Sequence, residues 1–401
     1  MSRRPGTPRL LRAINDRSAL ELLLERGPLT RPQLGALTGL SKPTASQLLV
    51  RLEQRGLVEA VGEQEGGRGP NARLYAVVPS CAYVVGVNAG PSGLRAEVAD
   101  IAGTVVGAAS VDSGDRADPV SLVHDAVASA TEDAGFSPDR LRRIVIGTPG
   151  LVDPGTGDIR FAWDLPSWHQ GLLAALRSDL HVPVAFENDV NLAAVAERYV
   201  GAASDREDFA LIWIGRGLGL AVVLDGRVLR GVNGAAGEIG YLPVAGAAVA
   251  RIQPESKVYP GGFQSLVSAS AVQELAASHG VRAASAEDAL LAAHDGGRAG
   301  QRLLDELAER IALGVAAVNA VVDPGVVVLA GEVGRAGGQS LAGRVAAAVT
   351  RISLPPCEVR VSAVAGDPVL RGAILSALTV ARDEIFDSTT DEPRELTPAG
   401  S

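Results

Sequence analysis

The 401-residue sequence predicts an α/β protein with a small, basic N-terminal domain followed by a larger, acidic body of two similar lobes. Three observations support this fold class. The 47 glycines are too many for a helical bundle and suit an α/β fold with many tight turns. Short amphipathic helical patterns fill residues 16–56, whereas strand patterns dominate from residue 82 onward. Hydrophobic residues make up 47% of the chain, which is enough for a sizeable core.

Charge is divided unequally between the two parts. Residues 1–78, the head, have a net charge of +5, which leaves −14 for the rest of a chain whose formal net charge is −9. A basic head on an acidic body indicates that only the head meets a polyanion. The two cysteines are far apart in the sequence, which excludes a disulfide framework. No stretch approaches the roughly 20 apolar residues of a membrane span. We therefore expect a cytoplasmic protein with no membrane partner.

The head combines three helical patterns. The first helix is expected near residues 18–26. Thr30 begins the second with a capping box and a proline in the first turn, and Leu34 and Leu37 are expected to face inward. Ser41 caps the third helix. The apolar stripe of this third helix comprises Ala45, Leu48, Leu49 and Leu52.

Residues 57–61 and 72–78 are expected to pair as a β-hairpin directly after the third helix. Together these elements predict a winged helix-turn-helix, whose third helix enters the major groove of DNA. Short polar side chains at the start of that helix can reach base edges and phosphates, and Arg68 at the tip of the wing can reach a minor groove. The alternative is a three-helix protein-interaction module. The predicted DNA-binding residues are Arg31, Ser41, Lys42, Pro43, Thr44, Ser46, Gln47, Arg51 and Arg68.

The body repeats a pattern of strands followed by a helix and a buried strand, which suggests duplicated α/β lobes around a cleft. A glycine-rich run at residues 215–219 resembles a dinucleotide fingerprint, but that motif must open a helix and a second strand follows here. The expected strands cover 83–87, 94–99, 104–109, 144–147, 209–215, 219–224 and 326–329, and the expected helices cover 119–134 and 301–322.

Three segments resemble the ROK family of sugar kinases and repressors, within the actin-like ATPase superfamily. They are Gly147–Asp153 (GTPGLVD), Phe186–Ala194 (FENDVNLAA) and Arg230–Gly240 (RGVNGAAGEIG). The head is similar to those of ROK repressors over residues 27–46. The resemblance implies an α/β protein in which a winged helix-turn-helix domain precedes a two-lobed, actin-like, sugar-kinase-like domain.

The domains are expected at residues 1–78, 79–190 and 191–367, with helix 368–386 completing the first lobe and a disordered tail at 387–401.

The resemblance also implies a sugar site. By the family pattern Asn188 and Asp189 bind sugar hydroxyls, Asp189 is the general base, and Glu238 accepts further hydrogen bonds. Residues 187–189 lie where a strand passes into a helix, so their side chains can point into the cleft; the alternative is that they are helix caps and turn residues. Tyr241 and Ser265 replace a family His and Glu. The predicted ligand-binding residues are Gly150, Asn188, Asp189, Glu238, Tyr241 and Ser265.

The nucleotide side departs from the family pattern. Asn88 lacks the charge that helps to hold a metal ion, and Pro91 removes an N–H from the first phosphate loop. Arg216 replaces a Thr in the second loop, and Glu332 places a carboxylate near a polyanionic nucleotide. We therefore expect no kinase activity and no cofactor, with Asp189 a vestigial base.

No metal site is expected either. In place of the family's zinc ligands, Tyr241 stands for a His and residues 257–265 contain no cysteine. The five histidines show no ligand spacing.

These features predict a transcriptional regulator of carbohydrate genes, with a repressor favoured over an activator. Its partners would be operator DNA, a second copy in a homodimer or homotetramer, and a sugar or sugar-phosphate effector. The alternative is an ATP-dependent sugar kinase fused to a DNA-binding domain. A third possibility is a regulator whose cleft binds nothing and whose body serves only for oligomerisation.

Overall fold

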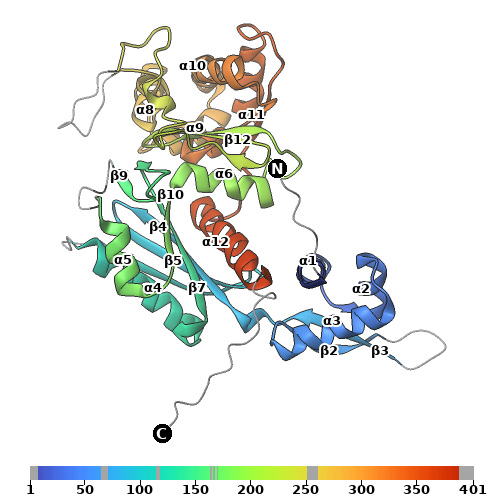
Figure 1. Cartoon of the computed structure of the whole chain (residues 1–401). Helices are drawn as coiled ribbons and strands as arrows, with labels where there is room; N and C mark the ends of the chain where they lie inside the picture. Colours follow the sequence, from blue (N-terminus) through green and yellow to red (C-terminus); the bar gives the residue numbers. More distant parts are fainter. Residues whose placement is uncertain are drawn as a thin grey trace.

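The computed structural model describes residues 8–64, 71–113, 118–162, 165, 168, 170–250 and 261–387. It consists of a winged helix-turn-helix head and two α/β lobes, each built on a five-stranded sheet (Figure 1). The predicted fold class is confirmed. None of the helices in these ranges is both long enough and apolar enough to cross a membrane.

The head contains the three expected helices and the wing. Thr30 forms the predicted capping box, and Ser41 caps the third helix by accepting a hydrogen bond from the Thr44 amide. The elements are α1 (Pro8–Arg26), β1 (Leu29–Thr30), α2 (Arg31–Thr38), α3 (Lys42–Gln54), β2 (Val58–Gln64) and β3 (Ala72–Val77), with β3 between β1 and β2 in the sheet.

Two expectations for the head are wrong. The first helix begins at Pro8 instead of near residue 18, so it is about twice as long as expected. Leu37 is 42% exposed rather than inward-facing. The second helix ends at Thr38, and Leu40 packs against the core of the head in the next stretch of chain.

Lobe 1 has a mixed sheet with the strand order β10-β7-β4-β5-β6. Strands β4, β5 and β6 form an antiparallel meander, and β7 and β10 run parallel to β4. Helices α4 and α5 cover one face and α12 covers the other. The elements are β4 (Tyr83–Gly90), β5 (Gly93–Asp100), β6 (Val105–Asp112), α4 (Pro119–Ala134), β7 (Leu141–Thr148), β8 (Leu151–Val152), β9 (Ile159–Phe161), α5 (Leu172–Leu180), β10 (Val184–Asn188) and α12 (Pro368–Asp387).

Lobe 2 has the strand order β13-β12-β11-β14-β15. Strand β12 returns antiparallel to β11, as expected for the glycine-rich turn between them. Helix α6 lies on one face of the sheet, and the remaining helices pack on the other. The elements are α6 (Asp189–Val200), β11 (Phe209–Ile214), β12 (Leu218–Leu224), β13 (Arg227–Val228), α7 (Gln264–Val267), α8 (Ala269–Ser278), α9 (Ala286–Asp295), α10 (Gly297–Val322), β14 (Val326–Ala330), α11 (Gly331–Val349) and β15 (Glu358–Val361).

The chain passes between the lobes at α6 and again in the segment before α12. These two helices pack side by side at the junction of the lobes, and α12 then extends toward α1 of the head (Figure 1). The strand-to-helix step at Asn188 therefore lies where the lobes meet. The predicted tail at 387–401 lies outside the described residues, apart from the last residue of α12.

Candidate functional site

The first turn of α3 is the most accessible polar surface of the third helix. Lys42, Pro43 and Thr44 are exposed there, Gln47 is exposed one turn later, and Ser46 is half-buried. The opposite face of α3 is buried in the head. A helix N-terminus attracts anions because its amide N–H groups are unpaired and its dipole is positive. This surface has the side chains and the polarity that contact with a DNA phosphate or base edge requires.

The arginines predicted to bind DNA differ in their surroundings. Arg31 is exposed at the start of α2, with its Nη2 3.5 Å from the Tyr75 hydroxyl. Arg51 instead pairs with both carboxylate oxygens of Asp16, which is 1% exposed, with Nε 2.9 Å from Oδ2. Its guanidinium therefore joins α3 to α1 inside the head, and the geometry does not support Arg51 as a DNA contact. Arg68 lies outside the described residues.

Asn188 and Gly150, both predicted ligand residues, lie in contact. The Asn188 Oδ1 caps α6 by accepting hydrogen bonds from the amides of Val190 (3.0 Å) and Asn191 (3.1 Å), and its Nδ2 donates to the Gly150 carbonyl at 3.1 Å. Asp189 is the first residue of α6 and is half-buried. Asn188 is thus a helix cap, as the alternative proposed. Its side-chain amide has two N–H groups, and the one not used by the Gly150 carbonyl can donate to a ligand.

A charged pair that was missed in the sequence joins the two lobes beside this cap. The Glu187 Oε1 accepts a hydrogen bond from the side-chain Nδ2 of Asn191 at 2.9 Å, and Oε2 accepts one from the Arg230 Nε at 2.7 Å. Arg230 opens the glycine-rich segment of lobe 2, and Glu187 is the residue before the last of β10 in lobe 1. The opposite charges in two motifs of the same cleft were the available signal, but their separation along the chain gave no reason to pair them.

Glu238 lies in the turn that follows Arg230. A side chain at Gly237 would overlap the carbonyl of Leu220, so only glycine allows this turn to pack against β12. The Glu238 carboxylate is half-buried, and none of the described residues donates a hydrogen bond to it. Burial raises the pKa of Glu238 above the ordinary range of a carboxyl group. A desolvated acceptor without a protein donor is suited to receive hydroxyl groups from a ligand.

Tyr241 and Ser265 come from two segments that pack together. Tyr241 ends a short 3-10 helix, and Gly262, just before α7, approaches its backbone so closely that a side chain would collide with Gly240. The Ser265 hydroxyl donates to the Gly262 carbonyl at 2.8 Å. Its proton is therefore used within the turn, and only its oxygen lone pairs remain to accept a hydrogen bond.

An acidic side chain lies at each of the two predicted phosphate loops. Asp367 accepts a hydrogen bond from the Asn88 Nδ2 at 2.8 Å and also pairs with Arg95. A cavity of about 380 Å³ beside this group is lined by Asn88, Ser92, Arg95, Ser110 and Asp112. At the second loop the Glu332 carboxylate lies so close to Gly215 that a Cβ there would overlap it.

The residues present do not fit a thiolate zinc site. Within the described ranges, no group of three or more His, Cys, Asp or Glu side chains is arranged to hold a metal ion. Cys81 lies at the junction of head and lobe 1 and Cys357 precedes β15, and burial raises the pKa of each thiol to about 11. Both thiols are therefore protonated at neutral pH, whereas zinc binds the thiolate.

Two family models match this chain. The ROK family model matches residues 84–378 and the MarR family model matches residues 14–69. The chain is 25% identical over 242 residues to the N-acetylglucosamine repressor of Escherichia coli O6:H1, covering 60% of this chain and 59% of that protein. It is 26% identical over 238 residues to the xylose repressor of Bacillus subtilis, covering 58% and 61%. The matched region thus spans about three fifths of the length of these curated relatives.

Two solved structures have a similar fold. A ROK family transcriptional regulator, described as a homolog of the E. coli MLC protein, superposes with a TM-score of 0.70 over 95% of this chain and 98% of its own, at 22% identity. The ROK hexokinase of Thermus thermophilus superposes with a TM-score of 0.61 over 75% of this chain and 99% of its own, at 27% identity. The first spans nearly the whole chain, and the second spans about three quarters of it.

Proposed function

Because the chain belongs to the ROK family, we propose that it is a transcriptional regulator, with a repressor favoured, whose operator binding responds to a sugar or sugar derivative. The observation on which this rests is the presence in one chain of an exposed polar first turn on α3 and a half-buried carboxylate at Glu238 to which no described residue donates a hydrogen bond. The first suits a DNA groove and the second suits sugar hydroxyls.

In this proposal α3 enters the major groove with its first turn, and Arg31 contacts the backbone. Lys42 places a positive charge beside the positive end of the α3 dipole, where a phosphate would be held by both. Winged heads of this kind act as symmetric pairs on palindromic sites, which favours a homodimer or homotetramer. Such a regulator acts in the cytoplasm, where the DNA is.

The effector would bind between the lobes, with Asn188 donating, Glu238 accepting and Asp189 at the first turn of α6. The Glu187–Arg230 pair would hold the two sides of the site at a fixed separation. Tyr241, Ser265 and Gly150 would shape the pocket around the sugar. Relatives named for N-acetylglucosamine and for xylose make these two sugars the first to test.

We infer that the body is not a kinase and uses no cofactor or metal, with Asp189 left as a vestigial base. At the first phosphate loop Pro91 removes an amide, and the Asn88 side chain is already bonded to Asp367. At the second loop the Glu332 carboxylate opposes the charge of a nucleotide triphosphate. The alternative is an ATP-dependent sugar kinase. Its support is the similarity of the body to a hexokinase of the same fold.

One experiment separates these functions. Binding of the purified protein to DNA from upstream of its own gene is measured with N-acetylglucosamine, xylose and glucose, and ATP consumption is followed with the same sugars. A regulator binds the DNA and releases it with one sugar, without consuming ATP. Sugar-dependent ATP turnover that disappears in Asp189→Asn would support the kinase instead. DNA binding that no sugar changes would leave the body as an oligomerisation module.

A further inference from the structure

A small hairpin of lobe 1 lies outside both five-stranded sheets. Its strands, β8 (Leu151–Val152) and β9 (Ile159–Phe161), form a two-stranded sheet of their own. Asp153 closes the turn between them, because its amide donates to the Asp158 carbonyl at 2.9 Å and its Oδ1 accepts from the Gly155 amide at 2.8 Å. The hairpin is therefore a compact unit held together by its own hydrogen bonds.

This hairpin touches the glycine-rich turn at residues 230–238 of lobe 2, here called the lobe 2 turn. Gly234 has a left-handed conformation, with a φ of 74°, and a Cβ there would overlap the Val152 carbonyl oxygen. Glycine suits this position on both counts, because it adopts a positive φ without strain and has no Cβ. The first strand of the hairpin and the lobe 2 turn thus lie in direct contact.

Arg160 of β9 adds a polar contact between the same two segments. Its Nη1 lies 3.5 Å from the Asn233 Oδ1 of the lobe 2 turn, and its Nε pairs with the Asp153 Oδ2 at 3.0 Å. The Arg160 side chain is 51% exposed, and its bond to Asn233 is long for a hydrogen bond, so this contact opens readily. By comparison, the Glu187–Arg230 bond at the start of the lobe 2 turn is 2.7 Å long and Glu187 is 13% exposed, so that end is held more firmly.

The hairpin and the lobe 2 turn border the predicted sugar site from opposite lobes. The hairpin follows Gly150, whose carbonyl accepts from Asn188 at 3.1 Å, and the lobe 2 turn ends at Glu238. The same turn packs on β12, and β12 lies against the first turn of α6, where a Cβ at Gly219 would overlap Val190. The predicted ligand residues therefore lie on segments that contact one another in a closed ring.

We propose that the β8–β9 hairpin is a clasp for the effector, and that its contacts with the lobe 2 turn separate each time a sugar enters or leaves the ring. This inference rests on the proposed function for the presence of a sugar. A sugar held by Asn188 and Glu238 touches two segments of the ring, and binding sites bury most of the surface of a small ligand. Such burial requires an element that opens and closes. Arg160 is a positioning residue in this mechanism, because its contacts are with Asn233 and Asp153.

A clasp of this kind has a kinetic signature. The hairpin closes over the empty site and over the bound sugar alike, so it slows association and dissociation by the same factor. Weakening the clasp then raises both rate constants and leaves the affinity unchanged. A residue that contacted the sugar itself would change the dissociation rate and the affinity together. A residue needed only for folding would change neither rate constant in the folded protein.

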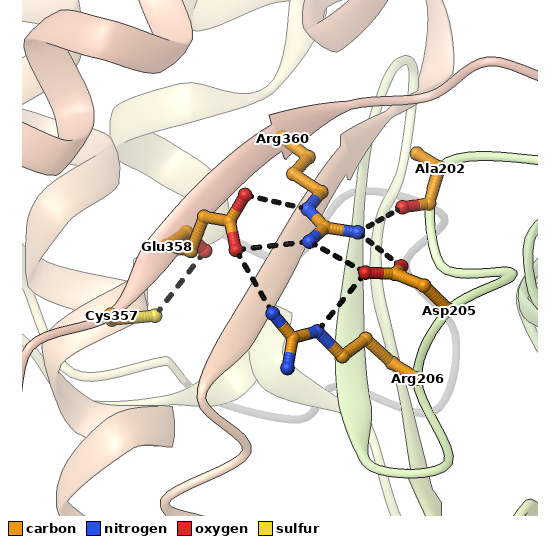
Figure 2. Close-up of polar contacts among 6 residues, drawn as sticks. All are labelled: Ala202, Asp205, Arg206, Cys357, Glu358 and Arg360. Carbon is orange, nitrogen blue, oxygen red and sulfur yellow. Dashed lines mark hydrogen bonds and ion pairs between the residues drawn. The ribbon is translucent and has the colours of Figure 1, made fainter.

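Stopped-flow measurements of tryptophan fluorescence follow the binding of N-acetylglucosamine, xylose and glucose to the full chain. For a sugar that releases DNA, Arg160→Ala is expected to raise both rate constants by about two- to tenfold, with a change in affinity below about twofold. Arg206→Ala is the matched control, because Arg206 also pairs with carboxylates and its side chain is 47% exposed, but it lies beside β15 of lobe 2 (Figure 2). Unchanged rate constants in Arg160→Ala, or faster dissociation with an equal loss of affinity, overturn the clasp.

Gly234→Ala tests the backbone contact by the same measurement. Its Cβ would push the lobe 2 turn away from Val152, so both rate constants are expected to rise at least as much as in Arg160→Ala. Gly280→Ala is the matched control, since Gly280 has a φ of 81° but open space around it, so it has the same backbone strain without the contact. Equal rate constants in the two glycine variants contradict the mechanism. Where Gly234→Ala does not fold, Arg160→Ala decides.

Hydrogen exchange without sugar tests the contact itself and separates this inference from the proposed function. Amides at residues 151–161 and 230–237 are expected to exchange at least about threefold faster in Arg160→Ala than in Arg206→Ala, because each segment loses a contact that holds it. Equal exchange in the two variants contradicts the clasp. If no sugar changes DNA binding, the proposed effector function fails, and the exchange measurement alone decides whether Arg160 holds the hairpin to the lobe 2 turn.

Discussion

Replacing Glu238 by Gln tests the sugar site most directly, because it removes one charge and changes almost no volume. The carboxylate is half-buried, and none of the described residues donates a hydrogen bond to it. A hydrogen bond to a charged group contributes about 1.5–3 kcal/mol, so its loss is expected to weaken sugar binding by about 10- to 150-fold. The folded protein should be as stable as the wild type or more stable, because the substitution removes a desolvated charge.

The pH dependence follows from the same burial, which raises the pKa of Glu238. A raised pKa means that the ionised carboxylate costs stability above the ordinary pKa of Glu, and that this cost is relieved as the pH falls through the raised value. Sugar hydroxyls donate to the ionised form, so sugar affinity should fall over the same pH range. In Glu238→Gln, the contributions of this group to the pH dependence of stability and to the pH dependence of sugar affinity should both disappear.

Calorimetric titration with the sugar that releases DNA measures the affinity, and thermal unfolding measures the stability. Glu132→Gln, an exposed change on α4, is the control for loss of a carboxylate elsewhere in the body. Equal sugar affinity in Glu238→Gln and the wild type across this pH range would remove Glu238 from the site. A large loss of stability in Glu238→Gln would show that its carboxylate has a structural partner.

Three further outcomes are expected. Lys42→Ala should weaken binding to all DNA sequences alike and reduce the salt dependence of binding by about one counterion, measured by titration at several salt concentrations; a loss confined to one sequence would argue for base contact. Arg51→Ala should instead destabilise the head by about 3 kcal/mol in denaturant unfolding, because it leaves Asp16 buried and unpaired; an unfolding midpoint equal to that of wild type would contradict this. Cys81, whose pKa burial raises to about 11, should resist alkylation at pH 8 in the folded protein and react once the protein is unfolded.

The regular elements with strong local signals were predictable. Helix α4 spans residues 119–134 as expected, because Asp118 caps it, Pro119 opens it and Gly135 ends it in a left-handed conformation. Helix α1 was predicted ten residues too short. Its first half has no strong capping signal, and part of it is held by the Asp16–Arg51 pair, a tertiary contact that no local pattern reveals.

The candidate site was predictable in its residue types and less so in its connections. The family resemblance identified Asn188, Asp189 and Glu238, but neither resemblance nor spacing indicated that Glu187 pairs with Arg230. The same limit explains why Arg51 was predicted to bind DNA. It has a positive charge, as Lys42 does, but a buried carboxylate, Asp16, lies within reach and pairs with it. Charge type is a property of the sequence, whereas the availability of that charge depends on the folded partner.

At the first phosphate loop, too, the folded structure shows a partner that the sequence did not indicate. The sequence argued against a phosphate site from what is missing, an acid replaced by Asn88 and an amide removed by Pro91. The structure adds what is present: Asp367 already occupies the Asn88 amide and pairs with Arg95. A ligand that uses the Asn88 amide would first have to displace Asp367 from it. The same Asp367 caps α12, so the residue that occupies the Asn88 amide also holds the start of the helix that leads to the head.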